Sequence, residues 1–336
     1  RDARAGCGLM GVLSLAHEAQ LARALEVARD VVAGGSLGAV STDELAGALY
    51  GQWYAAPNAE VAAMAAGAER SGRVALPLAA ILRASHPDAE VWTPAVVVRP
   101  GLHGTIVVQV AEGGIRAVAR GDLAPELTVG VGRGPRPGDR VRVRARAGGL
   151  VEGGWWRTWG GGCRAGRAPT GDLTRMYLAP RPEMIRRLVP AVLGVLHDLD
   201  VPWLFKVGAD WPMLARPDGA VLYLPDPAVG LVSGAATPLV ARLVGAVDGL
   251  VAGPGPALSV PVAPGVSWVQ DPGDGLSFGE TVCRALARAV LSRPGLLAPD
   301  GGTSRSEDLT VLAVGLGEAG IDPRAPHLRP LPKEAA

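Results

Sequence analysis

The fold is decided by three short apolar runs: Thr174-Arg-Met-Tyr-Leu178, Trp203-Leu-Phe-Lys-Val207 and Ala220-Val-Leu-Tyr-Leu224. Their length and their β-branched and aromatic content predict strands. Between the first two runs, residues 183–199 carry apolar side chains at positions 184, 185, 188, 192, 195, 196 and 199, a spacing that predicts an amphipathic helix. Further helices are expected at Pro238–Val251 and Gly279–Leu291, with a strand at Val266–Gln270. This alternation predicts a mixed α/β core over residues 166–336.

Two other regions precede this core and differ from it in pattern. Residues 1–90 are expected to be helical, because Glu18–Val32 and Asp43–Tyr54 have apolar spacings near three and four, and Ser41 offers a helix N-cap. Residues 91–165 are expected to form a small, bent antiparallel sheet or barrel. Its strands are predicted at Val96–Val98, Ile106–Val108, Ile115–Val118, Leu127–Val129 and Arg140–Arg146. The predicted fold class is therefore α+β. After about residue 294 we expect weak structure that includes one more apolar run, Leu309–Leu316.

Composition narrows the classes of function. The net charge of +1 gives no overall basic field to recruit nucleic acid, and no apolar run reaches the roughly 18 residues of a membrane helix. Three widely spaced cysteines suggest neither a disulfide framework nor a zinc site, so a cytoplasmic setting is expected. The chain also lacks a Gly-Lys-Ser/Thr phosphate loop, a Gly-x-Ser-x-Gly elbow and paired histidines for a metal.

The use of lysine is unusual. Only Lys206 and Lys333 occur, against 33 basic residues in total, and Lys206 lies inside the apolar run. Arginine is always protonated, whereas a lysine amine can be tuned to act as a base. The position is equally compatible with a structural lysine that extends its amine to solvent at a strand end. Both interpretations remain open from the residues alone.

An arginine-rich strand is predicted at Arg140–Arg146. Its period of two puts Arg140, Arg142, Arg144 and Arg146 on one face. The simpler interpretation, which we favour, is a solvated sheet face; the alternative is a binding stripe for an acidic peptide or phosphates. Three tryptophans follow at 155, 156 and 159, but the low net charge argues against a platform for single-stranded nucleic acid.

A glycine-rich turn, Asp271–Glu280, leads into the helix predicted from Gly279. Ser277 and Glu280 have the spacing of a capping box, in which the hydroxyl accepts a first-turn amide and the Glu reaches back. Free amides at a helix start also favour anions. Asp271, Asp274 and Glu280 oppose an anion there, and Arg284 one turn later partly restores the attraction.

Several segments together resemble the HopA family. They are Leu49–Tyr54, Val98–Gly101, Gly154–Trp156, Thr174–Leu178, Val201–Val207, Arg216–Leu224, Asp271–Gly275, Ser277–Gly279 and Cys283–Arg284. Some members of that family are type III effectors of plant pathogens. Others occur beside kinases in class V lanthipeptide and thioamitide gene clusters. The enrichment of this chain in Ala, Gly, Pro and Arg suggests a GC-rich genome, which fits this second group. One position departs from the family pattern: the Arg that usually precedes the Cys is Val282 here.

The resemblance implies a lyase that eliminates phosphate from phosphoserine or phosphothreonine in a ribosomal precursor peptide. Lys206 is the candidate base, and Tyr177 could donate a proton or hydrogen bond. Arg175, Arg216, Ser277 and Arg284 are the candidate phosphate-binding residues. This elimination needs no redox or metal cofactor. The implied partners are the phosphorylated precursor and an aminoglycoside-phosphotransferase-like kinase, with no nucleic acid and no membrane.

An alternative from another class stays open. The chain could be a non-catalytic subunit that binds the precursor leader or activates the kinase. The arginine stripe and Val282 favour this alternative, whereas the isolated Lys206 favours an enzyme.

Overall fold

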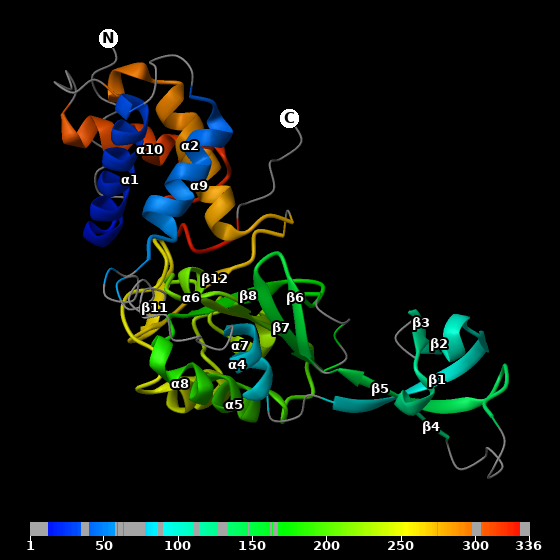
Figure 1. Ribbon diagram of the computed structural model, residues 1–336. Coiled ribbons are helices and arrows are strands. Elements are labelled where there is room, and N and C mark those ends of the chain that lie inside the picture. The colour runs from blue at the N-terminus through cyan, green and yellow to red at the C-terminus, as the bar shows by residue number, and fades with distance from the viewer. Residues whose placement is uncertain are drawn as a thin grey trace.

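The computed structural model describes residues 13–34, 40–57, 59, 63, 78–86, 90–110, 114–125, 134–146, 148–161, 163, 167–273, 275–297 and 304–329. Over these residues the chain has a mixed α+β fold with two antiparallel sheets, so the predicted fold class is confirmed (Figure 1).

The larger sheet forms the centre of the molecule. Its strand order is β11-β12-β8-β10-β9-β7-β6. The strands are β6 (Gly148–Glu152), β7 (Trp155–Gly160), β8 (Leu173–Leu178), β9 (Trp203–Gly208), β10 (Ala220–Pro225), β11 (Val260–Ala263) and β12 (Val266–Gln270). The predicted strands at 174–178, 203–207, 220–224 and 266–270 are confirmed. Because successive side chains point to opposite faces, each central strand serves two separate cores.

One face of this sheet packs against α5 and α8, with α4 beside them (Figure 1). The elements of this layer are α4 (Leu78–Ala84), η4 (Pro182–Met184), α5 (Ile185–Leu196) and α8 (Pro238–Val247), and two short helices, α6 (Trp211–Leu214) and α7 (Asp226–Val229), flank the strands. Met176, Phe205 and Leu222 point into this core from neighbouring strands. The predicted amphipathic helix at 183–199 is thereby explained, since its apolar stripe covers the sheet.

The opposite face is covered by helices from both ends of the chain. They are α1 (Leu15–Gly34), α2 (Thr42–Leu49), the π-helical segment η1 (Tyr50–Tyr54), α9 (Phe278–Leu291), η5 (Pro294–Leu297) and α10 (Arg305–Glu318). Figure 1 shows α1 and α2 beside α9 and α10. The helical N-terminal region therefore shares one core with the C-terminal part of the chain.

The prediction of weak structure after residue 294 is wrong for α10. Ser304 caps this helix through a capping box with Glu307, and Leu309, Leu312 and Leu316 are buried against the helical core. The apolar run was visible in the sequence, but the helices that it packs against, α9 and α1, are known only from the fold.

The smaller sheet has the order β3-β2-β1-β5-β4 and stands away from the rest of the molecule (Figure 1). Its elements are β1 (Glu90–Pro100), η2 (Leu102–Gly104), β2 (Ile106–Val110), β3 (Ile115–Val118), η3 (Arg120–Asp122), β4 (Leu123–Pro125) and β5 (Arg140–Arg146). It has its own core of Val and Ala with Ile106. The predicted strand Leu127–Val129 lies outside the described residues.

The predicted extent of the small domain, 91–165, differs from the structure at its end. β6 and β7 pair into the larger sheet, next to β9. The physical reason is Trp156, which is fully buried in the core beneath that sheet. Among the described helices, none is both long and apolar enough to cross a membrane.

Candidate functional site

The candidate site lies on the sheet face that looks toward α2, η1 and α9. Tyr177 on β8 pairs with Val221 on β10, and Val221 pairs with Lys206 on β9. These three residues therefore form one row on one face of the sheet. With strands about 4.8 Å apart, the backbones at Tyr177 and Lys206 are roughly 10 Å apart, on either side of β10.

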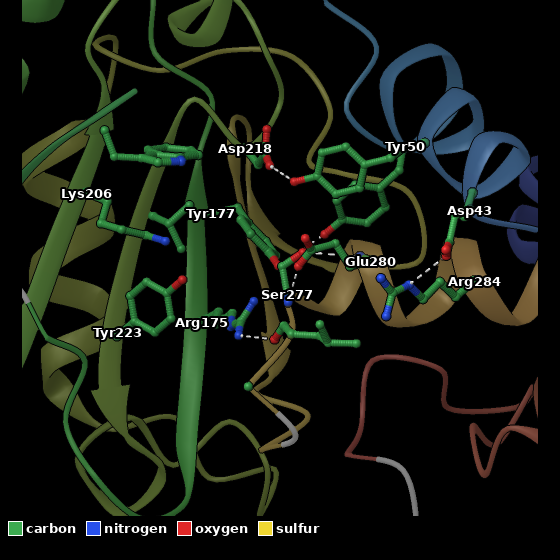
Figure 2. Close-up of a pocket in the computed structure, with 17 residues that line it drawn as sticks. Asp43, Tyr50, Arg175, Tyr177, Lys206, Asp218, Tyr223, Ser277, Glu280 and Arg284 are labelled. Carbon is green, nitrogen blue, oxygen red and sulfur yellow. Dashed lines mark hydrogen bonds and ion pairs between the residues drawn. The ribbon is translucent and has the colours of Figure 1, made fainter. Parts of the chain in front are cut away.

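A cavity of about 530 Å³ opens between this face and the helices (Figure 2). It is lined by Asp43, Ala46, Gly47, Tyr50, Tyr54, Trp155, Arg175, Tyr177, Lys206, Asp218, Val221, Tyr223, Gly275, Leu276, Ser277, Glu280 and Arg284. Five of the six predicted site residues thus line one cavity. The sixth, Arg216, is not among these residues but contacts three of them, Tyr50, Trp155 and Asp218.

Lys206 is half-buried and is held by aromatic rings. Its Nζ lies 4.9 Å from the centre of the Trp155 ring and 4.8 Å from that of Tyr223. Ring faces attract a cation within about 6 Å. In the part of the chain that the structure describes, no carboxylate forms an ion pair with Lys206, unlike the three arginines described below.

Tyr177 and Tyr54 share a hydrogen bond at the back of the cavity. Their hydroxyl oxygens are 3.1 Å apart, and both side chains are buried. Burial raises the pKa of the Tyr177 hydroxyl against the opposing effect of Arg175, and burial also raises the pKa of Tyr54. Both hydroxyls therefore stay protonated at neutral pH, so this pair can supply a hydrogen-bond donor and cannot supply a base.

Arg216 is engaged by a buried carboxylate. Its Nε donates to Asp218 Oδ1 at 2.8 Å, and its terminal NH₂ donates to Asp218 Oδ2 at 2.7 Å and to the Tyr50 hydroxyl at 2.9 Å. Although burial acts to lower the pKa of the Arg216 guanidinium, the Asp218 charge outweighs it and raises the pKa. Burial and the Asp218 charge raise the pKa of Tyr50 to about 12. Arg216 and Asp218 therefore form a bidentate ion pair, and the Tyr50 hydroxyl accepts a further hydrogen bond from Arg216.

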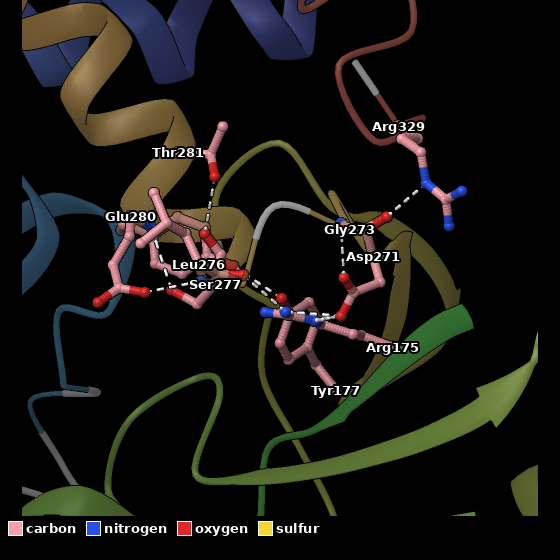
Figure 3. A network of polar contacts seen from close by, with 10 residues as sticks. Arg175, Tyr177, Asp271, Gly273, Leu276, Ser277, Glu280, Thr281 and Arg329 are labelled. Atoms are coloured by element: carbon pink, nitrogen blue, oxygen red, sulfur yellow. Dashed lines mark hydrogen bonds and ion pairs between the residues drawn. The ribbon is translucent and has the colours of Figure 1, made fainter. Parts of the chain in front are cut away.

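Arg175 likewise has polar partners already (Figure 3). Its Nε donates to Asp271 Oδ2 at 2.6 Å, and its terminal NH₂ donates to the Leu276 carbonyl at 2.8 Å. Asp271 also accepts the amide of Gly273, whose φ of +78° suits glycine. Arg175 therefore ties β8 to the turn that enters α9, and the same contacts place it in the cavity wall.

Ser277 caps α9 as the sequence predicts. Its hydroxyl accepts the Glu280 amide at 3.1 Å, and the Glu280 carboxylate accepts the Ser277 amide at 2.6 Å. Glu280 and Arg284 are four residues apart and so face the same side of the helix. Arg284 Nε is 3.8 Å from Asp43 Oδ1 on α2, and both side chains are largely exposed.

Val282 stands where the family pattern has arginine. This side chain is fully buried in the helical core and is not part of the cavity wall. Arg284, one half-turn further along the helix, provides the cation on the cavity side.

Several residues that line the cavity were not among the site residues predicted from the sequence; they include Asp218, Tyr50, Tyr223 and Trp155. All four lie in segments that carried the family resemblance, and that was the available signal. Their roles depend on contacts between distant segments: Tyr50 and Asp218 are 168 positions apart. No group of three His, Cys, Asp or Glu residues that could hold a metal occurs within the described ranges.

The fold and the site define a mixed α+β protein with a cavity of tyrosines and paired charges between a helical layer and an antiparallel sheet. Residues 163–328 match the model of the HopA1 effector protein family. This part of the chain belongs to that family, which confirms the resemblance for the motifs between Thr174 and Arg284; the motifs before residue 163 lie outside the match.

Two solved structures align with nearly the whole chain. The effector protein from Pseudomonas syringae pv. tomato strain DC3000 is 13% identical, with 95% of this chain and 100% of that chain covered and a TM-score of 0.46. The effector protein from Pseudomonas syringae pv. syringae strain 61 is 15% identical, with coverages of 94% and 100% and a TM-score of 0.40. A search of proteins with curated functions gave no match.

Proposed function

We propose that this cavity eliminates phosphate from phosphoserine or phosphothreonine in a ribosomal precursor peptide and leaves a dehydroamino acid. The observation that carries the proposal is the position of Lys206. It lies two strands from the Tyr177–Tyr54 hydroxyl pair on the same sheet face, without a carboxylate partner among the described residues. An amine and a protonated hydroxyl two strands apart on one cavity wall are suitable for removing a proton and assisting a leaving group.

The reaction needs one base and stabilisation of the departing phosphate. The neutral Lys206 amine takes the proton from the α-carbon of the phosphorylated residue. The electron pair of that C–H bond forms the Cα=Cβ double bond, and the Cβ–O bond breaks so that phosphate leaves with its bonding electrons. The Tyr177 hydroxyl donates a hydrogen bond to the leaving oxygen. No oxidant, reductant or further co-reactant is consumed.

The arginines differ in their availability for phosphate. Arg175 and Arg216 hold Asp271 and Asp218 through short contacts, so an incoming phosphate must share or replace these carboxylates. Arg284 is exposed, and its contact with Asp43 is long, which leaves it the most readily redirected of the three. We therefore propose that Arg284 makes the first contact with phosphate and that Arg175, next to Tyr177 on the same face of β8, completes the site.

The substrate is the decisive test. A synthetic peptide with one phosphoserine or phosphothreonine, incubated with the purified protein, should lose the mass of phosphoric acid and gain a site that reacts with thiols. The same peptide with unphosphorylated Ser or Thr should remain unchanged, because hydroxide is a much poorer leaving group. A phosphopeptide that keeps its mass at high protein concentration would refute lyase activity. Because the peptide is supplied in phosphorylated form, the proposed kinase partner is not needed.

A non-catalytic subunit remains the second candidate function, favoured by one observation. The Arg175 and Arg216 guanidiniums are each satisfied by a carboxylate, and such fixed pairs can hold a folded binding surface without chemistry. In the same experiment this candidate predicts a phosphopeptide that binds and keeps its mass. Stimulation of an aminoglycoside-phosphotransferase-like kinase by the protein would then identify the subunit role.

A further inference from the structure

The small sheet concentrates two kinds of exposed surface. Residues 90–146 hold nine arginines against five acidic residues, a net charge of +4, although the whole chain carries only +1. Five large apolar side chains of the same segment are also exposed: Trp92, Val96, Val98, Leu102 and Ile115. They account for five of the nine large apolar residues that are exposed among those described. A patch that combines exposed apolar side chains with one sign of charge is typical of a binding surface.

The strand register places these side chains side by side. On β1 and β5 the directly opposed pairs are Trp92 with Arg144, Pro94 with Arg142, and Val96 with Arg140. The intervening residues Ala95, Val97, Val141 and Val143 are buried in the small core, so all six members of these pairs belong to the outer face. We call this set of six residues the outer face of the small sheet.

Trp92 positions two of the arginines of the outer face. The Arg144 guanidinium lies over its ring, 5.4 Å from the ring centre, and Arg142 donates to the Trp92 carbonyl at 3.3 Å. Arg142 and Arg144 are therefore held beside a line of Trp92, Pro94 and Val96 on β1. Because same-face neighbours on a strand are roughly 7 Å apart, three arginines on β5 lie at regular spacing along this apolar line.

We infer that the outer face of the small sheet is a docking surface for an acidic peptide segment whose carboxylate and apolar side chains share one face. Carboxylates would pair with Arg140 and Arg142, and apolar side chains would cover Pro94 and Val96. The carboxylates of such a segment complement the arginines of the outer face, and its apolar side chains complement the exposed Trp, Pro and Val. If the proposed function holds, the segment is the part of the precursor peptide that lies outside the cavity; this identification rests on that proposal, whereas the docking itself does not.

A nucleic acid fits these observations less well. Single-stranded nucleic acids are bound on several aromatic rings that stack successive bases. On the outer face Trp92 is the single aromatic residue, and the remaining contact surface is Pro and Val, which suit aliphatic side chains. An acidic peptide supplies both the charge and the apolar groups.

The test measures binding apart from chemistry. The probe is a fluorescein-labelled, unphosphorylated peptide of Glu-Ser-Leu-Ser repeats, which puts Glu and Leu on one face of an extended chain. Its affinity for the protein should fall about tenfold or more in R140E/R142E, and also in W92A. The matched control is R186E/R187E, which reverses two exposed arginines on α5 and should leave the affinity unchanged. Repeats with Ser in place of Leu should bind more weakly than the original probe.

Three outcomes would overturn the inference: no binding at low salt, equal loss of affinity in R186E/R187E, or tighter and equally variant-sensitive binding of a labelled single-stranded oligonucleotide. The last would assign the face to nucleic acid. Thermal unfolding verifies that each variant is folded. Failure of docking is distinguishable from failure of the lyase proposal, because R140E/R142E should still eliminate phosphate from a short phosphopeptide without the acidic segment.

Discussion

At the residue scale, Lys206 is the most informative side chain. An arginine in its place would keep the positive charge and the contact with ring faces, because guanidinium also stacks on aromatic rings. Only a lysine can also become a neutral amine. The Trp155 and Tyr223 rings hold this amine between them in the cavity wall, with Val221 of the neighbouring strand in register.

The exchange of Lys206 for arginine therefore distinguishes a role of its positive charge from a role as a base. We expect Lys206→Arg to fold, to bind a phosphopeptide, and to form no dehydrated product, so that the phosphopeptide persists in mass spectra. Lys206→Ala should lose product too, but it removes charge and base together. Arg157→Lys, the reverse exchange at the opposed position on β7, is the matched control and should keep activity.

Dehydration at near-native rate by Lys206→Arg would exclude this residue as the base. The Trp155 and Tyr223 rings would then hold Lys206 in its charged form, where it can bind phosphate. Another group would have to remove the proton.

At the scale of elements, α9 is fixed at its first turn by two features. The capping box of Ser277 and Glu280 satisfies amides at the helix start. Gly279 then lets the Tyr54 and Tyr50 rings of η1 rest directly on the helix, since an added Cβ would overlap both rings. The i→i+5 bond of the π-helical turn, from the Ala55 amide to the Tyr50 carbonyl at 2.8 Å, accompanies this arrangement. Such turns often occur at functional sites.

The chain offers a matched pair of caps to test whether Ser277 acts beyond stability. Ser277 starts α9 at the cavity, whereas Ser304 starts α10, and both form the same capping box. Each Ser→Ala variant should lower the free energy of unfolding by about 1 kcal/mol. If Ser277 also contacts phosphate, only Ser277→Ala should raise KM for the phosphopeptide. Equal stability losses with unchanged kinetics in both variants would restrict Ser277 to its structural role.

At the scale of the whole molecule, α1 and the segment after α10 approach each other at a pair of histidines. His17 lies on α1 and His327 in the C-terminal segment against Trp268 of the sheet. Burial lowers the pKa of both imidazoles, and the charge of His17 also lowers that of His327. The folded protein therefore favours the neutral rings.

This linkage predicts acid sensitivity of the fold. In the unfolded chain these histidines protonate near pH 6.5, whereas in the folded protein they protonate at lower pH. The stabilising contribution is present above about pH 6.5 and is lost as the pH falls through the lowered folded values. Denaturant unfolding from pH 7.5 to 5 should show a decreasing free energy of unfolding.

The double variant His17→Gln/His327→Gln should have a flatter dependence on pH over this range. His103→Asn is the control, because His103 is exposed and its φ of +50° is tolerated by Asn. A slope that is equally steep in the double variant would mean that other groups cause the acid sensitivity.

Features that depend on a few neighbouring residues were predictable from the sequence. Short apolar runs rich in β-branched and aromatic residues predicted the strands that carry Arg175, Lys206 and Tyr223, because this signal lies within a few adjacent residues. Capping at Ser41 and Ser277 was predictable for the same reason, since the hydroxyl bonds an amide only three residues away. The scarcity of lysine drew attention to Lys206 before its surroundings were known.

Contacts between distant segments became known only from the folded structure. It joined β6 and β7 to the large sheet, packed α1 against α10, and placed Tyr50 beside Asp218. It also showed that Arg175 and Arg216 are already paired with carboxylates. Strand order, helix packing and ion pairs across more than a hundred positions depend on the whole energy of the folded chain, and no local period or spacing encodes them.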